Sequence, residues 1–237
     1  MDEREIELKL LTGHSIEMDS GTTFYTPKLN EIITLGEFTY NEVVSYLLID
    51  KKNLKDVGHE EASNYEVALT YYFYDENFRK VFSKGVKLFL REKVHLSDEG
   101  YFYFEDNKVF SSESFDYMQR LIRKSNRIAA KNEPEFNPAN EQAKHLIDMI
   151  MKGRKEKPAP KESINLCSMI SGLAWKSNNI NLLNIGDLTI YQLYDGLDRL
   201  DNIDHYNHVM TGIYTGNVDG KKINFNDIHW KKIIENN

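Results

Sequence analysis

The sequence has a single cysteine, Cys167, and lacks any long apolar run. One cysteine excludes an intrachain disulfide and a zinc site built from cysteines, and it suits a reducing compartment. A membrane-spanning helix needs about 18 or more consecutive apolar residues, and no stretch approaches that length. The first residues, MDEREIELKL, are charged and lack the apolar segment of a signal peptide. We therefore expect no membrane association and a cytoplasmic location.

The chain also lacks a positive net charge, since its formal charge is −7 over 237 residues. Proteins that bind nucleic acid or anionic membranes in general need a basic surface, so this charge argues against both. Hydrophobic residues make up 41% of the sequence and aromatic residues 12%. That composition predicts a packed core in one large domain or two small ones.

Hydrophobic periodicity predicts an α+β fold that is predominantly helical. Ile6, Leu8 and Leu10 alternate with charged residues, which is the pattern of a half-buried strand in a small N-terminal β element. Residues 101–110 predict a mid-chain β-hairpin with a two-residue turn at Asp106-Asn107. Helices are expected at residues 27–33, 40–50, within 64–96, and at 115–131, 139–152, 164–176, 187–200, 202–214 and 227–234.

Residues 152–162, KGRKEKPAPKE, have the composition of a linker. They are mostly charged, contain two prolines and carry no apolar side chain larger than alanine. We therefore expect an N-terminal α+β domain at residues 1–151 and a C-terminal helical domain, a bundle, at residues 163–237.

The segment LNIGDLTIYQLYDGLDRL, residues 183–200, predicts an amphipathic helix capped by Asp187. Its apolar residues fall on one stripe, which suits packing against the core or against a partner. We take Leu193, Tyr194 and Leu197 from this stripe as candidate partner-binding residues.

A second candidate surface is basic. Arg120, Arg123, Lys124, Arg127 and Lys131 recur at helical spacing and form one stripe, opposite an apolar face. Residues 119–161 hold eleven Lys or Arg and five Asp or Glu. Such a stripe can bind an acidic partner or nucleic acid. The alternative is a solvated helix face that pairs with acidic groups of the same chain.

Residues with metal-binding chemistry gather on one helix face, where Asp201, Asp204, His205 and His208 share a side. The other side of that helix is apolar, so an ordinary amphipathic helix would turn the polar set toward water. We expect no metal, no cofactor and no catalytic residues. Cys167, between apolar neighbours, is expected to be a small buried residue, and Trp175 and Trp230 to be core or interface anchors.

Several segments resemble proteins encoded in the tail-morphogenesis modules of bacteriophages and prophages of Gram-positive bacteria. They are the N-terminal IELKLLTGHSI, YTPKLNEIITLG and YNEVVSYLLID and the C-terminal LLNIGDLTIYQLYDGLDRL and HWKKII. Proteins of that kind often act as tail assembly chaperones, which bind the tape measure protein and keep it soluble. An aromatic residue is common in them at the position of Gly186.

The resemblance implies a non-enzymatic phage morphogenesis protein in the cytoplasm of the bacterial host, most simply a tail assembly chaperone. Its expected partner is the tape measure protein or another tail protein. The alternative is a phage-encoded regulator or defence-evasion protein that binds a host protein or nucleic acid through the basic stripe. An enzyme acting through Asp201, His205 and His208 is the third hypothesis.

Overall fold

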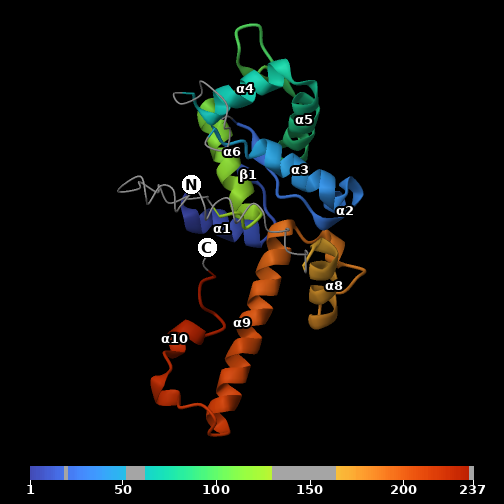
Figure 1. Cartoon of the computed structure of the whole chain (residues 1–237). Coiled ribbons are helices and arrows are strands. Elements are labelled where there is room, and N and C mark those ends of the chain that lie inside the picture. Colours follow the sequence, from blue (N-terminus) through green and yellow to red (C-terminus); the bar gives the residue numbers. More distant parts are fainter. Residues whose placement is uncertain (19–20, 52–61, 130–163, 235–237) are drawn as a thin grey trace, which may run out of the picture.

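A computed structural model of the chain describes residues 1–18, 21–51, 62–129 and 164–234 (Figure 1). The predicted helix at 139–152, the predicted linker at 152–162 and Lys131 lie outside these residues. The fold is α+β and predominantly helical, with one two-stranded and one three-stranded antiparallel sheet in the described part, which confirms the predicted class.

The N-terminal segment differs from the prediction, because residues 3–11 form helix α1 (Glu3–Leu11) instead of a strand. Asp2 and Glu5 form a capping box, and Ile6 and Leu10 are buried one helical turn apart. Leu8 is 62% exposed, so the apparent alternation was two residues of a helical stripe and one surface residue. The small β element follows, where β1 (Ile16–Glu17) pairs with β2 (Thr23–Phe24).

Four helices follow β2 in the described residues: α2 (Leu29–Leu35), α3 (Glu37–Leu47), α4 (Asn64–Tyr74) and α5 (Glu76–Leu90). Gly36, with φ 90°, separates α2 from α3, so α3 begins at Glu37, before the predicted start at residue 40. Ser63 and Glu66 form the capping box of α4. The Asp75 carboxylate accepts from two amide N–H groups and starts α5 directly afterwards.

The predicted hairpin is confirmed as β4 (Phe102–Phe104) and β5 (Val109–Phe110), and β3 (Val94–Leu96) adds a third strand beside β4. The predicted two-residue turn is wrong, because the register pairs Tyr103 with Val109 and the Phe104 amide donates to the Lys108 carbonyl at 2.9 Å. The loop therefore has three residues, 105–107, and Asn107 closes it with φ 57°.

The Tyr65 hydroxyl of α4 accepts a hydrogen bond of 3.0 Å from the Phe102 amide. The Tyr72 hydroxyl donates to the Val94 carbonyl at 3.1 Å, so α4 is fixed to the sheet.

Helix α6 (Ser112–Ser125) confirms the helix predicted at residues 115–131, although it starts and ends earlier. We call the part of the chain from α1 to α6, with its two sheets, the body. Aromatic rings fill the core between α4, α5, α6 and the sheet. Phe82 stacks on Phe102 with centroids 5.3 Å apart and on Phe115 at 6.2 Å. This cluster gives the body a continuous aromatic core.

The C-terminal part contains α8 (Leu166–Lys176), the short 3-10 helix η2 (Ile185–Asp187) and α9 (Ile190–Tyr214). A further turn, η3 (Gly220–Lys222), and α10 (Phe225–Ile228) follow. The two helices predicted at 187–200 and 202–214 are one helix, about 37 Å long, because nothing around Leu200 breaks it. Its cap is Thr189, whose hydroxyl accepts from the Gln192 amide, and not Asp187.

Helix α9 projects from the body, α8 lies beside its first half, and the chain after α9 runs back toward the body through α10 (Figure 1). Only the first residues of α9 are buried in the core. The buried hydrophobic cluster takes Ile190, Tyr191 and Leu193 from α9 together with residues of the N-terminal elements. The division into two domains stays a prediction, because the expected linker lies outside the described residues.

No helix in the described part of the chain is both long enough and apolar enough to cross a membrane.

Candidate partner-binding surface

The base of α9 is fixed to the body by backbone and side-chain hydrogen bonds. The Ile190 amide donates to the Pro27 carbonyl at 3.0 Å, and the Leu29 amide donates to the Leu188 carbonyl at 2.8 Å. The side-chain Nε2 of Gln192 donates to the Leu11 carbonyl at the end of α1, at 3.0 Å. These bonds hold the start of α9 against α1 and α2, so the direction in which the helix projects is defined.

The three apolar candidates of α9 are placed differently from one another. Leu193 is fully buried in the core, so its side chain is not on the surface. Tyr194 and Leu197 are half-buried and pack against the same core. Burial raises the pKa of the Tyr194 hydroxyl. The first residues of the predicted stripe therefore pack against the core of this chain.

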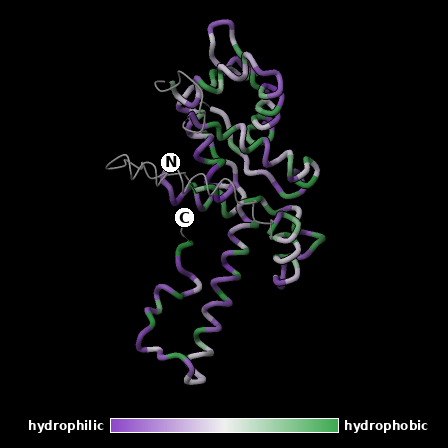
Figure 2. The backbone as a smooth tube through the Cα atoms, viewed as in Figure 1, coloured by the Kyte–Doolittle hydropathy of each residue, from purple (hydrophilic) through white to green (hydrophobic). Residues whose placement is uncertain are grey.

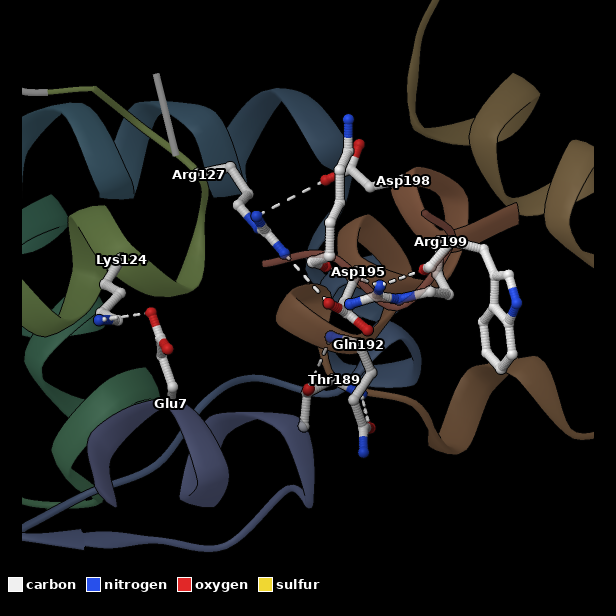
Figure 3. Close-up of polar contacts among 10 residues, drawn as sticks. Glu7, Lys124, Arg127, Thr189, Gln192, Asp195, Asp198 and Arg199 are labelled. Carbon is white, nitrogen blue, oxygen red and sulfur yellow. Dashed lines mark hydrogen bonds and ion pairs between the residues drawn. The ribbon is translucent and has the colours of Figure 1, made fainter. Parts of the chain in front are cut away.

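Arg127 is the main ionic contact between the end of α6 and α9. Its guanidinium lies 3.4 Å from an Asp195 carboxylate oxygen and 3.6 Å from one of Asp198 (Figure 3). The same guanidinium lies over the Tyr191 ring, 5.0 Å from its centroid. Its backbone has φ 53°, in the left-handed region. Burial raises the pKa of Asp198, and the positive charge of Arg127 opposes that shift.

Two other members of the basic stripe pair with α1. The Lys124 ammonium lies 2.7 Å from a Glu3 oxygen and 3.1 Å from a Glu7 oxygen, and the latter pair appears in Figure 3. Arg120 also pairs with Glu3. Arg123 is half-buried, and together with Arg120, Lys124 and Arg127 it lines a groove beside α6. Of the five stripe residues, four are described, and three of these pair with acidic groups of the same chain. This arrangement matches the alternative of a helix face that pairs with acidic groups of the chain itself.

The polar face of α9 contacts α8. The Lys176 ammonium lies 3.2 Å from an Asp201 oxygen and 2.6 Å from an Asp204 oxygen. These contacts raise the pKa of Lys176, chiefly through the hydrogen bond to Asp204. His205 and His208 are exposed on the same helix. Among the described residues, no group of three or more metal-binding side chains is placed to hold an ion.

Beyond Leu193, hydrophobic residues continue along α9 and along the chain that follows it (Figure 2). From Tyr194 to residue 234, the described chain contains no residue in the buried class. Tyr214, at the far end of α9, is 81% exposed. The projecting part of the C-terminal region therefore has apolar side chains but no core of its own.

Large apolar residues are also exposed on α8, just before it and in the turn after it. Trp175 is 80% exposed and Leu183 is 97% exposed, while Ile164 and Leu182 are also exposed. We call these four residues the α8 apolar surface. Cys167 is exposed as well, which overturns its expected burial, because α8 buries its Leu166, Leu173 and Ala174 face instead. Trp175 is not a core residue, so of its two expected roles only the interface role remains.

Sequence reasoning did not select the α8 apolar surface. Its residues do not form a regular stripe, and Leu182 and Leu183 lie in a turn, where periodicity carries no information. The available signal was Trp175 itself, two positions after the buried Leu173 and so off the buried face of α8.

Residues 155–235, about a third of the chain, match a family model described as the YomV second domain. YomV is a protein of Bacillus phages and prophages. No curated protein and no solved structure matches the chain. The C-terminal region, which carries α8, α9 and the α8 apolar surface, therefore matches a phage-associated domain family.

Proposed function

We propose that this protein is a non-enzymatic phage morphogenesis protein, specifically a tail assembly chaperone that binds the tape measure protein in the cytoplasm of the bacterial host. The proposal is supported by the phage-associated family match of residues 155–235 and by the resemblance of several segments to tail-module proteins. One observation carries it, namely that large apolar side chains stand exposed within that matched region, at Trp175 and Leu183.

The binding mode follows from the shape of this region. A long apolar or amphipathic helix of the partner can bury its apolar side chains against the α8 apolar surface, which removes apolar area from water on both sides. The body holds the base of α9 through hydrogen bonds and the Arg127 ion pairs. The surface is therefore presented on a fixed support, which lowers the entropic cost of binding.

The alternative, a regulator that uses the basic stripe, has less support. Arg120, Lys124 and Arg127 already pair with carboxylates of α1 and α9. A nucleic acid would have to displace these carboxylates, and the chain's net charge of −7 opposes its approach.

Co-expression with the tape measure protein of the same phage or prophage genome tests the proposal. We expect the native protein to keep the tape measure protein in the soluble fraction and to co-purify with it. Trp175→Asp combined with Leu183→Asp should abolish both effects without lowering thermal stability, because both side chains are already exposed.

The matched control is Ser171→Asp combined with Asn178→Asp, which adds the same charge at exposed polar positions of the same region. This control should keep full activity. A native protein that does not solubilise the tape measure protein would overturn the proposal. Equal loss in both double variants would overturn the assignment of the surface.

A further inference from the structure

A second surface lies on the body, in a groove of about 620 Å³ between α2 and α5. Its floor includes Leu35 from α2 and Leu88 from α5, and both side chains are half-buried and pack against the core. The groove therefore offers apolar surface to a ligand on a rigid support, since both helices belong to the packed body.

The rim of the groove is basic because two lysines of α5 and the C-cap residue of that helix line it. Lys84 and Lys87 lie one turn apart on one side of α5, and Arg91 follows the end of the helix in the left-handed conformation, with φ 61°. Arg91 is engaged by Glu31 of α2, with the nitrogen and oxygen 2.5 Å apart, and it also lies over the Tyr25 ring.

The two lysines differ from Arg91. Lys84 and Lys87 are exposed, and within the described ranges neither forms an ion pair. Three cations and one carboxylate thus surround an apolar floor. A basic helix face alone would be an ordinary solvated surface, but here it borders an apolar groove, and this combination matches a ligand with apolar and acidic groups at helical spacing.

We propose that this groove docks an acidic amphipathic helix of a protein partner. Its apolar side chains would lie on Leu35 and Leu88, and its carboxylates would pair with Lys84 and Lys87. The net charge of −7 makes an acidic helix selective for this groove, because most of the chain repels such a helix and the groove attracts it. The proposal does not rest on the chaperone function, since it uses α2 and α5 and not the α8 apolar surface.

A fluorescence anisotropy titration with a labelled 16-residue peptide tests it. The probe carries leucine at helical i, i+3, i+4 and i+7 spacing and glutamate at most other positions. A second peptide has the same leucines and glutamine in place of glutamate. We expect the glutamate peptide to bind the native protein at low salt, about tenfold more tightly than the glutamine peptide. That advantage should shrink as salt is added.

Lys84→Glu combined with Lys87→Glu should weaken binding of the glutamate peptide by about tenfold or more. The control, Lys93→Glu combined with Lys108→Glu, makes the same charge change at an exposed and a half-buried lysine of the β3–β5 region and should leave the affinity within about twofold. Thr34→Trp fills the groove from an exposed position of α2, so it should also block binding without disturbing the core.

Three results would overturn the proposal. They are no binding of the glutamate peptide at any salt concentration, equal loss in the groove and control variants, and binding that Thr34→Trp leaves unchanged. Vesicles of anionic lipid serve as a competing probe. If they bound the native protein and lost binding in the Lys84→Glu, Lys87→Glu variant while the peptide did not bind, the groove would be a membrane contact instead.

Discussion

The body and the projecting C-terminal part of this chain use hydrophobic residues differently. In the body, Phe82, Phe102 and Phe115 are fully buried and pack ring against ring. After Leu193, the described residues include many apolar side chains and none in the buried class. The body is therefore stabilised by its own core, whereas the described projecting part has no buried residues of its own. We propose that the body is the scaffold and the C-terminal part the binding region.

The sharpest test of this comparison truncates one apolar side chain in each region. Phe82→Ala should lower the free energy of unfolding by about 3–5 kcal/mol, because it removes the ring at the centre of the aromatic core and leaves a cavity. Met210→Ala, at a half-exposed position of α9, should lower it by less than about 1 kcal/mol. Urea unfolding measures both values, and equal losses would contradict the division.

A second test adds a methyl group to a glycine in each region. A Cβ at Gly85 of α5 would stand 2.7 Å from Leu47 and 2.8 Å from Val43 of α3, so the two helices could not keep their spacing. Gly85→Ala should destabilise the protein by about 1–3 kcal/mol despite the better helix propensity of alanine.

The matched variant is Gly172→Ala in α8, where an added Cβ meets no atom within 4 Å. Here only helix propensity acts, so the free energy of unfolding should rise by up to about 1 kcal/mol. Thermal unfolding of both variants should show melting temperatures that move in opposite directions. A shift of the same sign in both would mean that α3 and α5 are not closely packed.

The ion pairs give a third comparison. Arg127→Ala leaves Asp195 and Asp198 without their cation at the junction of α6 and α9, where the Arg127 side chain is 13% exposed. We expect a loss of about 1–3 kcal/mol in the free energy of unfolding. Lys176→Ala removes the exposed pairs to Asp201 and Asp204 and should cost less than about 1 kcal/mol. Denaturant titrations that rank Lys176→Ala above Arg127→Ala would refute this order.

A pH titration tests a single buried hydroxyl of the body. Burial raises the pKa of the Tyr40 hydroxyl, which donates a 2.6 Å hydrogen bond to the Asn126 side chain. Since the folded pKa lies above the ordinary value of 10.0, this stabilisation is complete below pH 10 and is lost as pH rises above it. The slope should reach about 1.4 kcal/mol per pH unit for this group.

Unfolding free energies measured between pH 9 and 11.5 should fall with pH in the native protein. Tyr40→Phe cannot ionise, so its slope should be shallower, although its stability at pH 8 is lower because the hydrogen bond to Asn126 is gone. Burial also raises the pKa of Tyr65 and Tyr191, so some slope should remain in this variant. Identical slopes in both proteins would show that Tyr40 titrates normally in the folded state.

Much of the local structure was predictable because short-range signals specify it. The loop of the β4–β5 hairpin needs a residue that tolerates positive φ, and Asn107 supplies it, although the loop has three residues and not the predicted two. The predicted strand at Ile6 to Leu10 was wrong because the Asp2 and Glu5 capping box outweighed a short alternation. The candidate site was predicted in part. The apolar stripe of α9 exists, but its first residues face the core. The exposed Trp175 was expected only as a core or interface anchor, and Leu183 was not selected.

The sequence by itself determined the composition of the core, the helix caps and the acidic character of the chain, since these depend on residue type and near neighbours. Only the tertiary structure decided how each surface is used. It brought Lys124 to Glu3 across 121 positions of the chain and Arg127 to Asp195 across 68, and so engaged the basic stripe internally. It buried Leu193 and left Leu183 exposed, because burial depends on which distant elements pack against a residue and not on its own hydrophobicity.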